Sequence, residues 1–524
     1  MLDVVLHGGW VVDGTGAPPW RADLGVHGDR IAAIGALSDV SAASRVDVSN
    51  RYLMAGFVDT HVHADASAAT EEVQTAALRQ GVTTVLIGQD GLSFAPASKD
   101  TITQISRYFG PVNGPCPPEL AGGCSVADLL AHYDRAGALN VGYLAPAGTI
   151  RAEVMGYRAG RPDRGELRAM RTLVEQALSD GALGLSTGLE YVPGRFADAG
   201  EIAELCAPVA AAGRVYVSHM RGYEADAWLG LQEVSDIARR SRIAVHVSHL
   251  HGPANMITQL ISQARGEGLD LTFDSYPYLR GSSILAMVAL PPYVQQAGPK
   301  DTASRLSDFN ERERLLQEWF PQIADVLERI TLSYVGAEEY SWAEGLSLHE
   351  AAKRAYTSLG AFVCDLVTAS DSGAGCVFSQ PPTNTEDDVR TLLRHEAQMV
   401  GSDGILLGSC PHPRGWGAFA RVLGRHTREL GDLTWGQAAL HLAGHPARRF
   451  GLTGRGLLRV GSFADVCVVD PAAVTDQATY TASRVPATGI SDVLVNGQFV
   501  LRNAALTGAK PGRGLRFGEE STST

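Results

Sequence analysis

The feature that most constrains the fold is an alternation of short apolar runs with longer helical patterns through the middle of the chain. Helical patterns cover 68–80, 166–180, 201–212 and 228–240. The apolar runs recur between them at 57–58, 82–88, 141–144, 183–186, 215–218, 244–248, 269–273 and 405–407. Eight such strand–helix units predict an α/β fold, a (β/α)8 TIM-like barrel, whose chemistry would lie at the carboxyl ends of its strands.

The two chain ends are strand-rich instead. Residues 3–6 and 10–13 flank Gly8-Gly9, which predicts a hairpin, and 492–495 meets 499–501 across Asn496-Gly497. We therefore expect a small β-sandwich domain made from 1–55 and 449–508 beside a barrel over 56–448. An insertion at about 279–349 interrupts the barrel pattern and is expected to cover the barrel mouth. The segment 509–524 is rich in Gly, Ser and Thr and is expected to be frayed.

Composition excludes several function classes. The formal net charge of −13 argues against a nucleic-acid binder. The longest apolar stretch, 284–290, ends at Pro291-Pro292, so no membrane association is expected. The seven cysteines form no CxxC pair, which favours a reducing compartment and predicts a cytoplasmic protein. A homo-oligomer is compatible with the sequence, which does not fix the number of subunits.

Histidines follow three of the predicted strands. His61 and His63 are two residues apart after the first strand, so both imidazoles can face one metal ion. His219 and His249 each follow a serine at the end of a later strand. Four histidines on one rim suit zinc, which prefers neutral imidazole ligands. Asp403 lies in Ser402-Asp-Gly404 just before the last run, which by itself is a common turn.

Longer motifs make the pattern specific. Gly56-Phe-Val-Asp-Thr-His-Val-His63, the two Ser-His strand ends and Asp403 resemble the amidohydrolase superfamily. The following segments narrow this to a resemblance to N-acyl-D-amino-acid deacylases (D-aminoacylases): Gly184-Leu-Ser-Thr-Gly-Leu-Glu-Tyr-Val-Pro-Gly194, Ser218-His-Met-Arg221, Ser248-His-Leu250, Tyr276-Pro-Tyr278 and His412-Pro-Arg414. The resemblance implies a barrel hydrolase that splits the amide of a small N-acyl amino acid with zinc, as one or two divalent ions.

The same resemblance implies roles for single residues. His61 and His63 would hold the first metal ion, and His219 and His249 the second. Asp403 would contact the metal-bound water, take its proton as general base and return it to the leaving amine as general acid.

One departure concerns the metal ligands. Many family members end the second strand in Gly-Asn-Cys-Gly, with the cysteine as a ligand, but this chain reads Gly88-Gln-Asp-Gly91. Asp90 therefore stands in place of the thiolate. Glu190, after the fourth strand, is the other candidate to replace it, and its longer side chain favours it as a bridge between two ions.

The remaining candidates are expected to contact the substrate: Tyr191, Arg221, His251, Tyr276, Ser282 and Arg414. Arg221 and Arg414 would bind its carboxylate, since a guanidinium donates two parallel hydrogen bonds. His251 occupies a position where the family often has lysine and would contact the same carboxylate. The two tyrosines would polarise the scissile carbonyl or hold the carboxylate.

Two rival functions stay open. A cyclic amide hydrolase resembling hydantoinase or dihydroorotase would normally show a bridging lysine after the fourth strand, which this chain lacks. A non-catalytic barrel scaffold would typically have lost its metal histidines, whereas four remain together with Asp403.

Overall fold

The computed structural model describes residues 1–518, and its centre is a barrel of eight parallel strands. Their order around the barrel is β8 (Phe57–Asp59), β10 (Val82–Ile87), β13 (Asn140–Pro146), β14 (Gly184–Gly188), β15 (Val215–His219), β16 (Ala244–Val247), β17 (Leu271–Ser275) and β21 (Gln398–Val400). Side chains join the last strand to the first, since Thr60 Oγ1 donates to the Val400 carbonyl over 3.1 Å. The predicted α/β barrel is confirmed.

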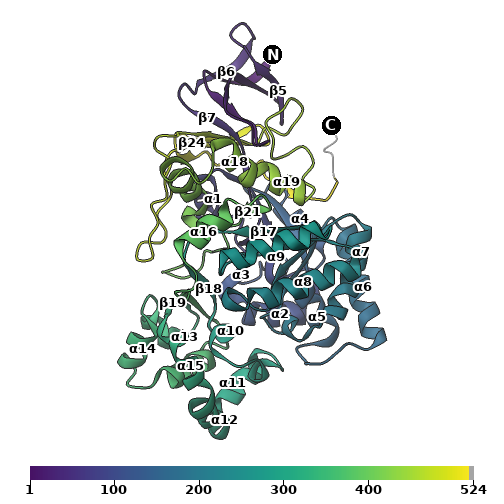
Figure 1. Ribbon diagram of the computed structural model, residues 1–524, viewed down its shortest axis with the longest axis vertical. Coiled ribbons are helices and arrows are strands. Elements are labelled where there is room, and N and C mark those ends of the chain that lie inside the picture. Colours follow the sequence, from purple (N-terminus) through teal and green to yellow (C-terminus); the bar gives the residue numbers. More distant parts are fainter. Residues whose placement is uncertain (519–524) are drawn as a thin grey trace.

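Amphipathic helices cover the outside of this barrel (Figure 1). The main ones are α1 (Glu71–Leu78), α4 (Val126–Tyr133), α6 (Arg164–Ser179), α7 (Ala199–Ala211), α8 (Ala227–Ser241), α9 (Ala254–Gly266) and α16 (Glu386–Leu393). Asp163 starts α6 with a capping box, in which Glu166 returns the hydrogen bond to the cap backbone. No helix within residues 1–518 is long and apolar enough to cross a membrane.

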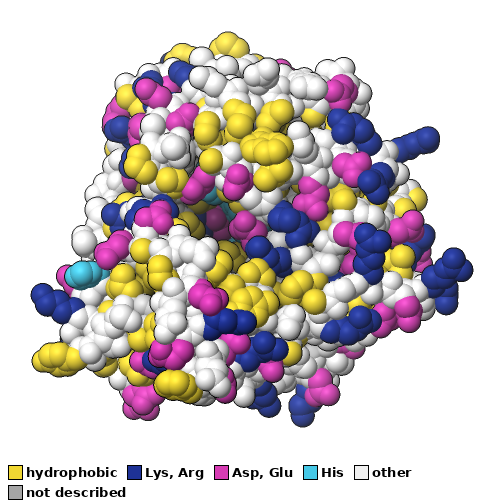
Figure 2. Space-filling model, turned by 60° about the horizontal axis from the view of Figure 1, so that its bottom comes forward, with side chains coloured by type: hydrophobic (Ala, Val, Ile, Leu, Met, Phe, Trp, Pro, Cys, Tyr) yellow, Lys and Arg dark blue, Asp and Glu magenta, His cyan; other side chains and the backbone are white. Residues whose placement is uncertain are grey.

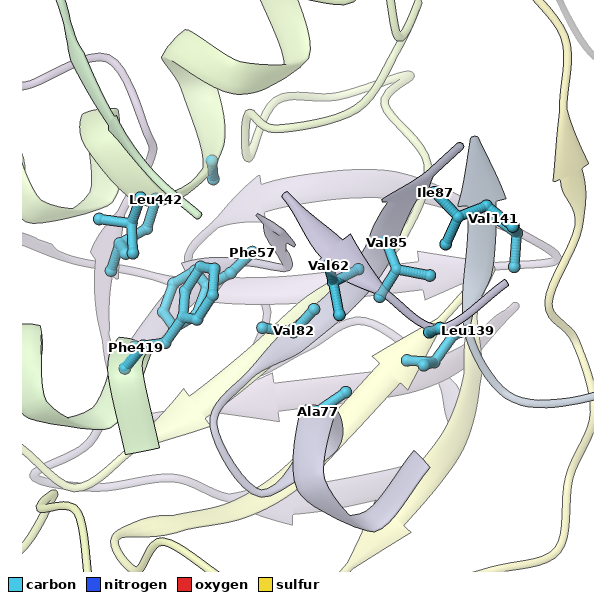
Figure 3. Close-up of a cluster of buried hydrophobic side chains, with 14 of the residues drawn as sticks. Phe57, Val62, Ala77, Val82, Val85, Ile87, Leu139, Val141, Phe419 and Leu442 are labelled. Carbon is cyan, nitrogen blue, oxygen red and sulfur yellow. The ribbon is translucent and has the colours of Figure 1, made fainter. Parts of the chain in front are cut away.

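Apolar side chains fill the space between the strands and these helices. Figure 3 shows part of this core, in which Phe57 of β8 lies beside Phe419. Their rings are stacked with centroids 6.1 Å apart, and Phe419 comes from α17 (Arg414–Arg421). This packing joins the helix that follows Asp403 to the first strand of the barrel, which precedes His61. Asp403 and His61 are therefore supported by the same packed core.

The eighth strand is not the one that the sequence predicts. Residues 398–400 take that place, while Gly404–Ile405 forms a separate short strand, β22, that pairs with β9 (Val62–His63). Three residues, Gln398–Val400, suffice here because all are buried and pair with β17. As a consequence Asp403 follows a barrel strand, as the other site residues do.

A long excursion leaves the barrel after β17 and returns at α16, before β21. It contains β18 (Arg280–Ile284), α11 (Pro299–Ser307), β19 (Ile330–Val335), α14 (Leu348–Arg354), α15 (Leu359–Ala369) and β20 (Ala374–Ser379). β20 pairs with both β18 and β19, and residues such as Leu332 and Phe362 form a separate hydrophobic core. The excursion therefore extends well past residue 349, since β20 completes its sheet; it lies at the bottom of Figure 1.

Strands from both chain ends pair in one seven-stranded sheet. It joins β2 (Trp10–Val12), β3 (Trp20–Arg21) and β7 (Tyr52–Ala55) to β23 (Val466–Val469), β24 (Ile490–Val495), β25 (Gln498–Arg502) and β26 (Ala505–Leu506). A second sheet holds β1 (Leu2–His7), β4 (Asp23–His27), β5 (Arg30–Gly35) and β6 (Ala42–Asp47). The predicted hairpin at Gly8-Gly9 is wrong, because β1 and β2 belong to different sheets.

The expected frayed tail is ordered as far as it is described. β27 (Gly514–Leu515) pairs with β13 of the barrel, and the Arg135 backbone N–H donates to the Gly512 carbonyl over 2.8 Å. Where the sequence predicts fraying over 509–524, the backbone from Pro511 to Phe517 therefore lies against the rest of the chain, and the glycines allow this close approach. Residues 519–524 lie outside the described residues.

Gly514→Ala tests this docking. A Cβ at residue 514 would collide with the Leu130 carbonyl oxygen, so we expect the free energy of unfolding to fall by about 1–3 kcal/mol. Urea unfolding measures the change. Gly266→Ala in α9 is the control, since nothing lies within 4 Å of its added Cβ, and it should not destabilise the protein. Equal stability of Gly514→Ala and the unchanged protein would contradict the docking.

Candidate active site

Six polar side chains converge at the carboxyl ends of the barrel strands: His61, His63, Asp90, His219, His249 and Asp403. They lie at the ends of β8, β10, β15, β16 and β21, and the whole set is buried. Asp90 and Asp403 both have left-handed backbone conformations, with φ of 55° and 49°. Such a φ is uncommon outside glycine, and here it turns both carboxylates toward the histidines.

Asp90 lies at the centre of this cluster. Its Oδ1 is 3.4 Å from His61 Nε2 and 3.7 Å from His249 Nε2. Its Oδ2 is 3.6 Å from His63 Nε2 and 3.5 Å from His219 Nδ1. One carboxylate therefore faces all four histidines.

Asp403 lies on the side of His61 and His63. Its Oδ1 is 3.4 Å from His63 Nε2 and 3.7 Å from His61 Nε2, while its Oδ2 is 2.8 Å from Arg414 Nη2. Burial alone would raise the pKa of Asp403, but the Arg414 guanidinium and the histidines outweigh it and hold that pKa below its usual range. Asp403 is therefore held as an ionised carboxylate, with Oδ1 facing the histidines.

The donor set fits a divalent metal ion. His61, His63 and Asp403 offer ligand atoms within 4.8 Å of one another, and so do His61, Asp90 and His249. Among the described residues, His61 Nε2 and Asp90 Oδ1 are buried and have no hydrogen-bond partner. Burial holds the pKa of His61 well below its usual value, which keeps its imidazole neutral. Neutral imidazole and carboxylate are ligands that zinc accepts.

Two of these histidines have a polar partner at a ring nitrogen. Asn113 at the end of α3 (Gly110–Asn113) lies 3.0 Å from His63 Nδ1, and Glu190 Oε2 lies 3.2 Å from His219 Nε2. The remaining oxygen of Glu190 accepts the Gly222 N–H over 3.2 Å. Such partners orient metal-binding imidazoles. Among the four histidines Glu190 contacts only His219, at Nε2, so the geometry does not support it as a bridging ligand, the role that the sequence favours.

Asp274 of β17 and Asn113 are two residues that the sequence analysis did not identify. Asp274 accepts the His249 backbone N–H over 2.7 Å, lies 2.8 Å from His246 Nε2, and has His61 Nδ1 at 4.0 Å. Burial raises the pKa of Asp274 to about 7. Its only sequence signal is its place at the end of a predicted barrel strand.

A cavity of about 260 Å³ opens beside the cluster. Figure 2 shows this hollow with histidine at its floor. Four of the expected substrate contacts line it: Tyr191, His251, Tyr276 and Ser282. Tyr223, Met287 and Phe378 line it as well, and sequence reasoning missed all three. Met287 and Phe378 belong to the excursion, which therefore supplies one wall of the cavity.

The two arginines do not line this cavity. Arg221 binds Glu233 and donates to the carbonyls of Arg195 and Ala197 over 2.5 and 2.7 Å. The geometry therefore does not support its expected role in carboxylate binding, because its donors are already occupied. Arg414 is fully buried between Asp403 and the Tyr276 ring, whose centroid is 4.5 Å from its guanidinium carbon.

His251 offers the cavity an acceptor rather than a cation. Its Nδ1 must donate to the His249 carbonyl, 2.8 Å away, which leaves a lone pair on Nε2. Burial lowers the pKa of His251 to about 4. The expectation that it binds a carboxylate as the family's lysine would is therefore not supported.

Comparisons with known proteins agree with this geometry. A family model described as "Amidohydrolase family" matches residues 373–501. N-acyl-D-glutamate deacylase from Alcaligenes xylosoxydans xylosoxydans is 35% identical, over 98% of this chain and 96% of its own length. D-aminoacylase from the same organism is also 35% identical, over 98% of this chain and 97% of its own length.

Solved structures give the same picture. A D-aminoacylase structure described with a binuclear metal centre has a TM-score of 0.83 and 32% identity, and the match covers 99% of this chain and 100% of that one. The zinc and phosphonate complex of N-acyl-D-glutamate deacylase from Bordetella bronchiseptica has a TM-score of 0.84 and 32% identity, covering 98% and 99%. Dihydropyrimidinase from Brevibacillus agri, 14% identical with a TM-score of 0.59, over 99% of this chain and 100% of its own, shares the fold.

Proposed function

Because this chain belongs to the N-acyl-D-amino-acid deacylase family of amidohydrolases, we propose that it hydrolyses the amide bond of N-acyl-D-amino acids. The reaction would use a divalent metal ion, of which zinc is the first candidate. The products are a carboxylic acid and a free D-amino acid. The observation that carries this proposal is the buried cluster of four histidines and two aspartates at the floor of an open cavity.

His61, His63, His219 and His249 are the residues that would hold the metal, together with Asp403. When bound, such an ion lowers the pKa of water to about 7 and polarises the acyl carbonyl. Asn113 orients His63 through its Nδ1, and Glu190 orients His219 through its Nε2.

Asp403 carries the proton in this mechanism. Its Oδ1 faces the histidines and accepts a proton from the attacking water, while Arg414 binds Oδ2 and keeps the group ionised beforehand. The protonated carboxyl then donates to the leaving amine. Arg414 thus acts through Asp403 as a positioning residue.

Tyr276 and Ser282 are where we place the substrate carboxylate. Both line the cavity, and Arg414 lies directly behind them, donating to the Ser282 carbonyl over 3.4 Å. Its positive charge favours an anion on this wall. Tyr191 shares a hydrogen bond of 2.7 Å with Ser283, and its ring lies 4.9 Å from that of His219, so we place the acyl group beside its hydroxyl.

The choice of substrate distinguishes the proposed deacylase from the two rival functions. A cyclic amide hydrolase shares the barrel, but no lysine lines the described cavity. A non-catalytic scaffold gains nothing from retaining the histidine cluster. The metal-loaded protein should release amine from N-formyl- and N-acetyl-D-amino acids and leave hydantoins and dihydropyrimidines intact. Opening of the hydantoin ring, with no amine released from the N-acyl-D-amino acids, would reverse the assignment.

Glu190→Ala should weaken zinc binding by about 10- to 100-fold, because His219 loses the acceptor for its outer nitrogen. Glu190→Gln keeps an acceptor oxygen and should recover most of the affinity. Competition titration with a chromogenic chelator measures both variants. Unchanged affinity in Glu190→Ala would show that His219 does not need this partner.

The predicted cytoplasmic location and homo-oligomer stay predictions, which cell fractionation and light scattering would test.

A further inference from the structure

We propose that Asp90 is the ligand shared by two neighbouring metal subsites, and that it makes this a centre of nitrogen and oxygen ligands that disfavours thiophilic ions. The proposal rests on the metal dependence of the proposed function. It goes further by stating which metal ions the centre prefers.

The position of the carboxylate is what a shared ligand requires. Asp90 contacts both histidine pairs, His61 with His63 and His219 with His249. Each Asp90 oxygen faces one histidine of each pair, at 3.4 and 3.7 Å for Oδ1 and at 3.6 and 3.5 Å for Oδ2. Asp403 contacts only the first pair among the four, and Glu190 only His219.

The backbone fixes Asp90 at this point. Gly88 and Gly91 on either side have positive φ, and an added Cβ would run into the Leu144 carbonyl oxygen or the Gly188 backbone nitrogen. Ser186 ties the turn together, accepting the Gly91 N–H over 3.2 Å and donating to the Gly88 carbonyl over 2.5 Å. The turn therefore fixes the backbone of Asp90, and with it the direction in which its Cβ points.

The burial of the Asp90 carboxylate favours a bound cation. Its side chain is 2% exposed, and within the described chain its Oδ1 has no hydrogen-bond partner. A buried carboxylate oxygen without a partner is costly, and a metal ion removes that cost. This observation does not depend on any substrate.

The ligand chemistry determines which ions fit. No cysteine lines the described cavity or belongs to the metal-binding groups, so every candidate ligand is imidazole or carboxylate. Thiolates select soft ions, whereas carboxylates suit harder ions such as Mn²⁺. Relative to an Asp90→Cys variant of the same chain, we expect the unchanged protein to prefer Mn²⁺ over Cd²⁺ by at least about 100-fold.

The experiment uses metal-free full-length protein titrated with Co²⁺. Absorption spectra report the ligands, elemental analysis reports the number of ions, and competition between Mn²⁺ and Cd²⁺ reports selectivity. The unchanged protein should show cobalt d–d bands without a thiolate-to-cobalt charge-transfer band. Asp90→Cys should gain that band, and Asp90→Asn should bind Co²⁺ at least about 10-fold more weakly at both subsites.

Glu224→Gln is the matched control, since it removes one carboxylate from the same cavity wall, and no hydrogen bond or ion pair joins that side chain to the four candidate metal histidines in the described chain. It should leave cobalt binding unchanged. Cobalt affinity and stoichiometry in Asp90→Asn equal to those of the unchanged protein would overturn the proposal, even if Asp90→Cys fails to fold. Failure of the proposed function looks different: the unchanged protein would bind no metal, or would bind it and cleave no N-acyl-D-amino acid.

Discussion

Asp403→Asn should lower kcat for deacylation by about a hundred- to ten-thousandfold while the metal stays bound. The amide has the same size and one oxygen in the same place, so packing and ligand geometry are largely kept. What it lacks is the ability to take a proton from water and return it to the amine. Steady-state amine release, with elemental analysis of the same samples, measures both quantities.

Arg414 supplies the control for this variant. Arg414→Met removes the charge behind Asp403 but leaves the carboxylate, so it should reduce the rate less than Asp403→Asn does. If Asp403→Asn kept most of the activity with full metal content, Asp403 would not be the proton carrier and another group would have to be found.

Removing the metal should abolish turnover and lower stability together. The cluster brings Asp90, Asp403 and four histidines into one buried volume, and an ion that binds only the folded state contributes about 4 kcal/mol when present at a thousand times its Kd. We expect dialysis against a chelator to leave less than about 1% of the rate and to lower Tm, and zinc to restore both.

The control for chelation is metal-free protein refilled with magnesium, which needs oxygen ligands in octahedral geometry and fits four imidazoles poorly. It should not restore activity. Full activity in protein shown to hold no metal would contradict the mechanism.

The sequence predicts the barrel and its histidines well, for a physical reason. Strands buried on both faces read as apolar runs, and a polar residue at their carboxyl end must reach the same rim. The strand pattern alone therefore places His219 and His249 beside His61. It misplaces the eighth strand, because Gln398–Val400 is only three residues long and the apolar run at 405–407 is stronger.

Side-chain direction is what the sequence cannot supply. Length favours Glu190 over Asp90 as the bridge, but the Glu190 oxygens are taken by His219 and the Gly222 N–H. The sequence also predicts Arg221 in the cavity, but Glu233, twelve residues later, binds it. Asn113 contacts His63 from a short helix fifty residues away in the sequence, and no local sequence pattern predicts such a contact.

Domain details fail for a related reason. A Gly-rich tail reads as disordered, yet glycines are what allow β27 to approach the Leu130 backbone so closely. The extent of the excursion depends on β20 pairing with two strands far away in sequence, which spacing alone does not reveal.

The most direct test of the central claim is amine release by the zinc-loaded protein from paired enantiomers of N-formyl- and N-acetyl-amino acids. We expect the D-enantiomers to be cleaved with kcat/KM at least about 100-fold above that of their L-partners. Equal rates for both enantiomers, or no amine from any of them by protein shown to hold zinc, would contradict the claim.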